Sequence, residues 1–413
     1  MELDVEFVRS QFPAFSVPSL KGQAFFENAG GSYACIQTID AITEFYTLNK
    51  VQPYAGYSAS IDAGNAMDAS HMRWANVLGV ELDEVHFGPS TSANTYVLGQ
   101  ALRSSIGPGD EVIVTNQDHE ANTGAIRRMA EAQGATLKEW RVDPVTGMLD
   151  VESFQDLLST RTKLVTFPHC SNVIGSENDV TSLTSMAHSV GARVIVDGVS
   201  FAPHTIPNVG DMGADVYLFS LYKVYSVHQG LMVVQNGFLD EISNQGHFFN
   251  AHLPGKRLTP AGPDHAQIAG ASGVLDYIEA LAAHHDISGT PARVMRDVSK
   301  LWRDHETRLL NPLLETLRRL HVRMLGPDTV DLPGTAYRCP TIAFVPRRHP
   351  ADVVAELVEK GVMTASGHFY AYRVLQGLGI EPDPGVVRLS FVHYTTTSEI
   401  EQAADALRSA LAS

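Results

Sequence analysis

The sequence predicts an α/β protein, with a mostly parallel, seven-stranded sheet in a large domain and a small C-terminal α+β domain. From residue 83 onward, short apolar runs alternate with helical patterns, which is typical of a parallel sheet covered by helices on both faces. The alternation lapses past residue 240, where polar segments follow. The expected strands are 83–88, 111–116, 136–142, 163–169, 193–198, 215–220 and 231–235, and the helices between them are 91–105, 120–134, 151–159 and 181–190.

The remaining elements divide the chain into an arm and two domains. We expect an N-terminal arm with a short helix at residues 1–20, a large domain at 21–285 and a small domain at 286–413. Thr396 and Glu399 have the spacing of a capping box before the last helix. The other expected helices are 35–49, 67–78, 264–285, 292–320 and 350–360, and the strands of the small domain are 322–326, 341–346 and 386–394.

Composition excludes several classes of partner. The chain has 30 Lys and Arg against 46 Asp and Glu, a formal net charge of -16, which argues against nucleic acid and anionic membranes as partners. Three cysteines, Cys35, Cys170 and Cys339, are too few and too scattered for a disulfide framework or a zinc motif. The acidic N-terminus resembles no secretory leader, and no apolar run approaches ~20 residues. We expect a cytoplasmic protein without a metal site.

Two ionisable residues lie at the ends of predicted buried strands. Asp197 ends the strand that begins at Arg193, and Lys223 follows the strand that ends at Ser220. A buried lysine is costly unless it is paired or used chemically, and one use is an imine with an aldehyde cofactor. Pyridoxal 5'-phosphate needs a lysine for its aldehyde and a carboxylate for its pyridine nitrogen. The pair therefore predicts this cofactor.

Further polar side chains follow other predicted strands. Thr91 and Ser92 begin a helix, where backbone N–H groups and hydroxyls can bind a phosphate. His119 could stack on a flat cofactor, Asn172 could donate to a ring oxygen or a carboxylate, and Arg388 could bind a carboxylate through two hydrogen bonds. Taken singly, these residues also fit a helix cap, a surface histidine, a turn asparagine and a solvent-facing arginine.

Two other enzyme motifs are incomplete in this chain. Ser220 and Lys223 match the Ser-x-x-Lys pattern of serine acyl-enzymes, but no Lys-Thr-Gly follows later in the sequence. His119 and Glu120 begin a His-Glu-x-x-His pattern, but Thr123 stands where the second histidine belongs. The order of the remaining motifs is more specific than any one of them.

This order resembles the class V aminotransferase family of pyridoxal-phosphate enzymes, fold type I, and in particular its cysteine desulfurase-like branch. The resemblance runs from Phe25 to nearly the C-terminus. It is carried by four stretches, Phe26-Glu27-Asn28-Ala29-Gly30-Gly31-Ser32, His169-Cys170-Ser171-Asn172-Val173-Ile174-Gly175, Val196-Asp197-Gly198-Val199-Ser200-Phe201-Ala202-Pro203-His204 and Ser220-Leu221-Tyr222-Lys223.

The resemblance implies a role for each matching residue. Lys223 would form the imine, Asp197 would pair with the pyridine nitrogen, and His119 would stack on the ring. Thr91, Ser92 and Ser220 would hold the phosphate. Asn172 and Arg388 would bind the substrate carboxylate, and Asn28 is a further candidate for substrate binding. His368 and Tyr370, on the loop expected in the small domain, are candidates either for shaping the substrate pocket or for packing within the loop. The resemblance also implies a homodimer with its active sites at the subunit interface.

The sequence departs from the family pattern at several positions. The stretch that corresponds to the persulfide loop, Thr364–Ala371, has no cysteine, and Cys170 lies in a different motif where a buried structural thiol is expected. Tyr222 stands where the family often has His, and Ser200 where a larger polar residue is common. Residues 260–263, Pro-Ala-Gly-Pro, replace a Gly-Thr-Pro turn. A sulfur relay through an enzyme cysteine is therefore not expected.

These observations predict a pyridoxal-phosphate enzyme that acts on a small α-amino acid, sulfur- and selenium-containing ones included. We expect β-elimination or C–S bond cleavage, with Lys223 moving the proton at Cα. Aminotransfer or epimerisation in the same site is the alternative, because these reactions share a carbanion intermediate. A non-catalytic pyridoxal-phosphate-binding module is a further alternative.

Overall fold

The computed structural model describes residues 1–332 and 337–411. Its centre is a seven-stranded sheet with the order β2-β8-β7-β6-β5-β3-β4. Only β8 runs antiparallel to its neighbours, so the mostly parallel sheet expected from the sequence is confirmed. The strands are β2 (Val85–Gly88), β3 (Glu111–Thr115), β4 (Thr136–Trp140), β5 (Thr162–Pro168), β6 (Arg193–Asp197), β7 (Val216–Ser220) and β8 (Gly230–Val234).

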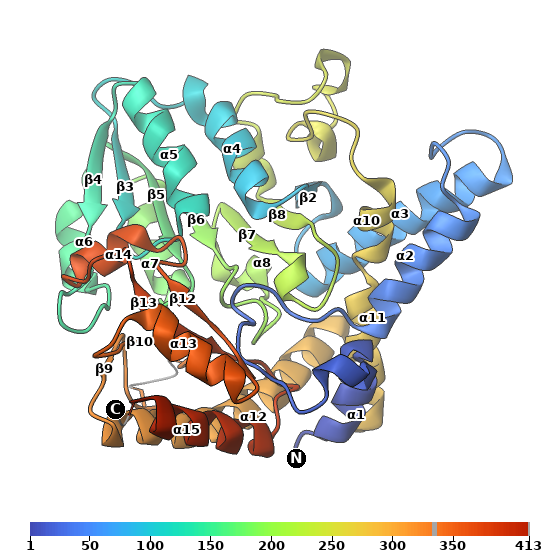
Figure 1. The fold of residues 1–413 in the computed structure, drawn as a ribbon. Coiled ribbons are helices and arrows are strands. Elements are labelled where there is room, and N and C mark those ends of the chain that lie inside the picture. Colours follow the sequence, from blue (N-terminus) through green and yellow to red (C-terminus); the bar gives the residue numbers. More distant parts are fainter. Residues whose placement is uncertain (333–336, 412–413) are drawn as a thin grey trace.

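Helices cover both faces of this sheet (Figure 1). Val112 and Val114 of β3 pack in one core with α4 and α5, whereas Ile113 packs in the core on the opposite face. This alternation follows from the two-residue period of a strand. The helices between the strands are α4 (Thr91–Ala101), α5 (Glu120–Ala132), α6 (Val151–Leu157), α7 (Val180–Ser189), α8 (Val209–Met212) and α9 (Asn236–Leu239).

A second, smaller sheet lies below the large one in Figure 1. Its strands are antiparallel and have the order β12-β13-β10-β9, and β1 and β11 form a separate parallel pair. The strands are β1 (Ala24–Phe25), β9 (Arg323–Met324), β10 (Thr341–Val345), β11 (Val362–Met363), β12 (Ala365–Gly367) and β13 (Val386–Ser390). The expected strand 386–394 therefore ends at Ser390, and the sequence patterns did not predict β1, β11 or β12.

One long helix joins the two hydrophobic cores. The first half of α12 (Pro291–Arg319) packs in the core beneath the large sheet, and its second half packs against the small sheet. The boundary expected at residue 286 lies just before this helix. The other helices are α1 (Val5–Ser10), α2 (Ile36–Leu48), α3 (Ser58–Leu78), α10 (His265–Gly270), α11 (Gly273–His284), α13 (Pro350–Glu359), α14 (Tyr372–Gly377) and α15 (Thr397–Leu411).

Two helix expectations were wrong. The helix expected at 67–78 begins at Ser58, because small and polar residues in its first turns hid the helical pattern. The long helix expected at 264–285 is two helices separated at residues 271–272. Short 3-10 turns lie in some of the connections between these elements. They are Pro13–Ser16, Pro18–Leu20, Leu82–Glu84, Leu102–Ser104, Leu221–Lys223, Phe248–Asn250 and Pro254–Lys256.

Candidate active site

A cavity of about 240 Å³ lies where several strands of the large sheet end. In an open α/β sheet, the crevice at the carboxyl ends of the strands is the usual place for a ligand. The structure brings all seven residues expected to contact the cofactor to this cavity. They are Thr91, Ser92, His119, Asn172, Asp197, Ser220 and Lys223.

Asp197 lines this cavity from the end of β6, and Lys223 lines it from the 3-10 turn that follows the neighbouring parallel strand β7. Asp197 is the last residue of β6, and its Oδ1 accepts a hydrogen bond from the Val199 N–H at 2.8 Å. Burial raises the pKa of Asp197 to about 6, although the Val199 N–H and Lys223 oppose the shift. Burial and the positive charge of Arg388 lower the pKa of Lys223 to about 8. The lysine is therefore partly neutral near physiological pH, as a nucleophilic or basic amine must be.

The start of α4 provides a site for an anion. Ser90 caps the helix by accepting from the Ala93 N–H at 3.1 Å. Next to it, the hydroxyls of Thr91 and Ser220 lie 2.7 Å apart and join α4 to the end of β7. The first residue of β8, Gly230, lies so close to the start of α4 that a Cβ there would be 2.5 Å from the Thr91 nitrogen. A glycine is therefore needed at this position. Hydroxyls and free backbone N–H groups at a helix start suit a phosphate.

His119 presents an uncharged ring to the cavity. It caps α5, with Nδ1 accepting from the Ala121 N–H at 3.0 Å, so the proton of the neutral ring is assigned to Nε2. Burial, followed by the charges of Lys223 and Arg388, lowers the pKa of His119 to about 3. A neutral imidazole can stack on a flat ring without adding a positive charge beside the lysine.

A second space, an outer chamber of about 550 Å³, adjoins the cavity. Lys223, His119 and Asn172 line both spaces, whereas Arg388 and Tyr370 line only the chamber. The Asn172 Nδ2 donates to the Phe369 carbonyl at 2.9 Å, which links β5 to the segment after β12. The Oδ1 of Asn172 is buried without a partner among the described residues. This oxygen is a free acceptor at the junction of the two spaces.

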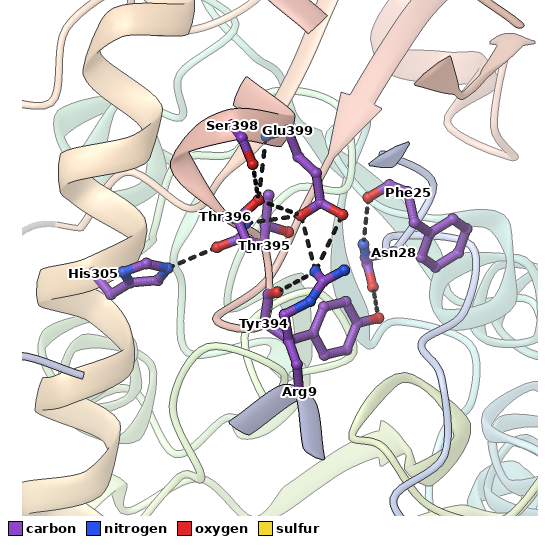
Figure 2. Close-up of polar contacts among 9 residues, drawn as sticks. All are labelled: Arg9, Phe25, Asn28, His305, Tyr394, Thr395, Thr396, Ser398 and Glu399. Atoms are coloured by element: carbon purple, nitrogen blue, oxygen red, sulfur yellow. Dashed lines mark hydrogen bonds and ion pairs between the residues drawn. The ribbon is translucent and has the colours of Figure 1, made fainter. Parts of the chain in front are cut away.

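The structure does not bring two of the expected substrate residues into the chamber. The Asn28 side chain donates to the carbonyls of Phe25 and Ser390, both at 3.3 Å, and accepts from the Tyr394 hydroxyl. Figure 2 shows its contacts with Phe25 and Tyr394. His368 turns back to accept from the Tyr370 N–H at 3.1 Å and does not line the chamber. Their substrate roles stay predictions, and the contacts of Asn28 are those of a structural residue.

Glu27, Tyr222 and His228 are among the lining residues that received no site role in the sequence analysis. Glu27 lines the chamber and pairs with Arg388, Oε1 to Nη2, at 2.6 Å. Tyr222 stacks on His228, with ring centroids 4.6 Å apart, and both line the cavity. An acidic residue in a glycine-rich turn was the available signal for Glu27. For His228, the available signal was a histidine two residues before Gly230, where β8 begins.

Cys170 lines the cavity but not the chamber. Its buried thiol donates to the Ser171 carbonyl at 3.7 Å. Within the described residues, no group of His, Cys, Asp and Glu forms a metal site. In the same part of the chain, no helix has both the length and the apolar character needed to cross a membrane.

The donor set fits pyridoxal 5'-phosphate. Asp197, with one carboxylate oxygen not bonded to Val199, lies around the same cavity as Lys223. The hydroxyls of Thr91, at the start of α4, and Ser220, at the end of β7, belong to residues that line it too. These are the partners that the ring nitrogen, the aldehyde and the phosphate of this cofactor require. Fold and site together define a pyridoxal-phosphate-dependent enzyme of fold type I.

Comparisons with known proteins agree with this class. The chain belongs to the family described as aminotransferase class-V, whose model matches residues 24–241 and 296–403. It is 33% identical to the aminotransferase-like protein FGM3 of Gibberella zeae, over 98% of each chain. It is 28% identical to a cysteine desulfurase of Pectobacterium atrosepticum, over 97% of each chain.

A solved structure shares the fold. The apo structure of a cysteine desulfurase from Thermococcus onnurineus superposes with a TM-score of 0.86 at 24% identity, covering 100% of this chain and 99% of the other. The family and the fold expected from the sequence are therefore confirmed, and with them the cofactor class.

Proposed function

We propose that this protein cleaves a C–S or C–Se bond in a small α-amino acid by β-elimination. Lys223 lines both the inner cavity and the outer chamber, and this position is the main support for the proposal. Its amine is therefore placed between the cofactor site and the space open to substrate. The relatives named cysteine desulfurases support the sulfur chemistry.

Each residue would contribute one physical effect. Pyridoxal phosphate supplies the electron sink that stabilises a negative charge at the substrate Cα. Asp197 would hold the proton on the ring nitrogen, and the Thr91 and Ser220 hydroxyls would bind the phosphate. Lys223, with its pKa lowered to about 8, would accept the Cα proton. Arg388 would orient the substrate carboxylate, and the second N–H of Asn172 Nδ2, the one that the Phe369 carbonyl does not accept, would donate to it.

The absence of a cysteine from the chamber supports direct release of the leaving group. The segment 364–371 forms β12 and the turn after it, and it contains no cysteine. Cys170 is confined to the inner cavity, with a thiol engaged by a backbone carbonyl. We therefore propose that sulfide or selenide is released directly, and that no persulfide forms on a cysteine of the enzyme.

Aminotransfer is the second candidate. It is favoured by the 33% identity over 98% of the chain to a protein named aminotransferase-like. The same residues would serve both reactions, because each begins with removal of the Cα proton. The reactions differ in their products, since aminotransfer leaves an amino group on the cofactor and elimination does not.

We also propose that two copies of the chain associate. Large apolar side chains are exposed on α2, on the loop between α2 and α3, and on the segment before α10. They include Tyr46, Leu48, Tyr54, Tyr57, Phe248 and Phe249, of which Phe248 is 87% exposed. Exposed apolar surface of this kind is typical of a protein interface. Measuring the molar mass of the purified protein by light scattering tests this proposal, and a monomer at working concentration would contradict it.

The reaction is tested by incubating the cofactor-loaded protein with cysteine, cysteine sulfinate, selenocysteine and alanine. Mass spectrometry would identify the products, and Lys223→Ala serves as the inactive control. Pyruvate and ammonia together with sulfide from cysteine, or with selenide from selenocysteine, support elimination, whereas alanine together with sulfite from cysteine sulfinate contradicts it. A keto acid that retains the side-chain sulfur or selenium, together with aminated cofactor, supports aminotransfer. Alanine together with persulfide on a protein cysteine would contradict direct release.

A further inference from the structure

Arg388, the residue expected to bind a substrate carboxylate, already holds a carboxylate of the chain itself. Its Nη2 lies 2.6 Å from Oε1 of Glu27, which comes from the turn after β1. The Arg388 side chain is only 3% exposed and lies over the Phe369 ring at 3.9 Å. Its Nη1 donates to the Asn172 carbonyl at 3.3 Å. The guanidinium is thus fixed on two sides, and Arg388 is one of the residues that line the chamber.

The ion pair is only half satisfied. Nε of Arg388 and Oε2 of Glu27 are both buried, and neither has a hydrogen-bond partner within residues 1–332 and 337–411. Nε and Nη2 lie on the same edge of a guanidinium, the edge that can bind both oxygens of one carboxylate. Glu27 fills one of these two donor positions. A ligand carboxylate that approached this edge would satisfy both donors.

Gly30 allows Glu27 to adopt this position. A Cβ on residue 30 would lie 2.7 Å from Glu27 Oε1, so any larger residue would displace the carboxylate. The backbone of Gly30 lies outside the left-handed region, so alanine can adopt its conformation there. Both residues line the chamber of about 550 Å³, which offers space for a displaced Glu27 side chain.

We propose that Glu27 is a specificity-determining residue that occupies the carboxylate subsite of Arg388 until a substrate carboxylate displaces it. The inference rests on the proposed function, because it concerns the substrate of that site. Glu27 lowers the affinity for every ligand carboxylate, since the ligand must first break an existing ion pair. Only a ligand that accepts from both Nε and Nη2 of Arg388 gains enough binding free energy to replace the single hydrogen bond of Glu27.

The first test compares an amino acid with its amide on cofactor-loaded protein. L-Alanine and L-alaninamide differ only in the carboxylate, and the change in the visible spectrum on binding gives their dissociation constants. Glu27→Gln should tighten the binding of L-alanine about tenfold, the change that corresponds to one hydrogen bond to a charged group. The affinity for L-alaninamide should stay within a factor of two. Gly30→Ala should likewise tighten the binding of L-alanine and leave the affinity for L-alaninamide within a factor of two.

Glu120→Gln is the matched control. Glu120 is also acidic and also lines the chamber, but it pairs with Arg373 at 2.8 Å instead of Arg388. This variant should leave the ratio of the two affinities as in the unsubstituted protein. An equal change for alanine and its amide in Glu27→Gln, a weaker binding of alanine, or the same gain in Glu120→Gln would overturn the inference.

A second test uses the apo-protein and is independent of catalysis. Phenylglyoxal modifies accessible arginines, and peptide mapping reports the modification of Arg388. In Glu27→Gln, Arg388 should react faster, and acetate should protect it at about tenfold lower concentration than in the unsubstituted protein. Equal rates and equal protection in the two proteins would overturn the inference. If the loaded protein shows no response to any amino acid, the proposed function fails while this test still decides the role of Glu27.

Discussion

The hydroxyl oxygens of Thr91 and Ser220 lie 2.7 Å apart, and their contact joins the start of α4 to the end of β7. Both residues line the inner cavity, in front of the backbone N–H groups that begin the helix. A phosphate bound there would receive hydrogen bonds from the helix and from both hydroxyls. This contact marks where the phosphate of the cofactor would bind.

We expect Thr91→Val and Ser220→Ala each to weaken the binding of pyridoxal phosphate to the apo-protein. Each change removes one hydrogen bond to a charged group, worth about 1.5–3 kcal/mol, or roughly tenfold or more in affinity. An absorbance titration measures the dissociation constant. Thr95→Val is the control, because Thr95 lies one turn further along α4, is fully buried and does not line the cavity. Equal losses in Thr95→Val and Thr91→Val would contradict the assignment.

Asp197 predicts a pH dependence of apo-protein stability. Its pKa is raised from 3.8 to about 6 by burial, so the folded state holds the proton more tightly than the unfolded state does. The contribution of Asp197 to stability is therefore present below about pH 4 and is lost as the pH rises to about 6. At pH 7, apo Asp197→Asn should be more stable than the unsubstituted protein by up to about 3 kcal/mol. Urea unfolding at pH 4 and pH 7 measures this difference, which should disappear at pH 4.

Lys223 predicts a pH dependence of reactivity. With a pKa of about 8, its amine should react with acetic anhydride in the apo-protein with a midpoint near pH 8, as peptide mapping would show. Arg388 lowers this pKa and Glu27 raises it, so Arg388→Gln should shift the midpoint upward and Glu27→Gln should shift it downward. A midpoint above pH 10 would show that the amine is not desolvated.

Asn28→Ala should act on stability instead of cofactor binding. It removes hydrogen bonds that connect the turn after β1 with Ser390 and Tyr394, at a cost of about 1–3 kcal/mol in the free energy of unfolding. Arg9 strengthens the same region, donating to the Tyr394 carbonyl at 2.9 Å and pairing with Glu399 at 3.0 Å (Figure 2). Tyr394→Phe should cost a similar amount, and the double variant should cost less than the sum. A change in substrate affinity without loss of stability would instead favour the substrate role.

The sequence predicted the parts of the fold and site that depend on local pattern. Apolar runs at regular spacing located the strands of the large sheet, and parallel strands bring their carboxyl ends to one edge. For this reason Asp197 and Lys223, at the ends of neighbouring strands, could be placed together before the structure was known. Thr396 and Glu399 form the expected capping box, because each bonds the backbone of the other.

Contacts between distant segments could not be predicted in this way. Glu27 and Arg388 are 361 residues apart, and no local pattern shows that the turn after β1 lies beside β13. The partner of Asn28, Tyr394, lies in the same distant segment. Short strands such as β1 and β11, with two residues each, carry no detectable period of their own. These elements are specified by tertiary packing and not by local sequence.

Lys223 is the residue that we expect to hold the cofactor aldehyde. The protein loaded with pyridoxal phosphate should be reduced with borohydride, digested and mapped by mass spectrometry. The mass of the reduced phosphopyridoxyl group should be found on the peptide that contains Lys223, and Lys223→Ala should carry none. A label on another lysine, or no label on a protein that has bound the cofactor, would contradict it.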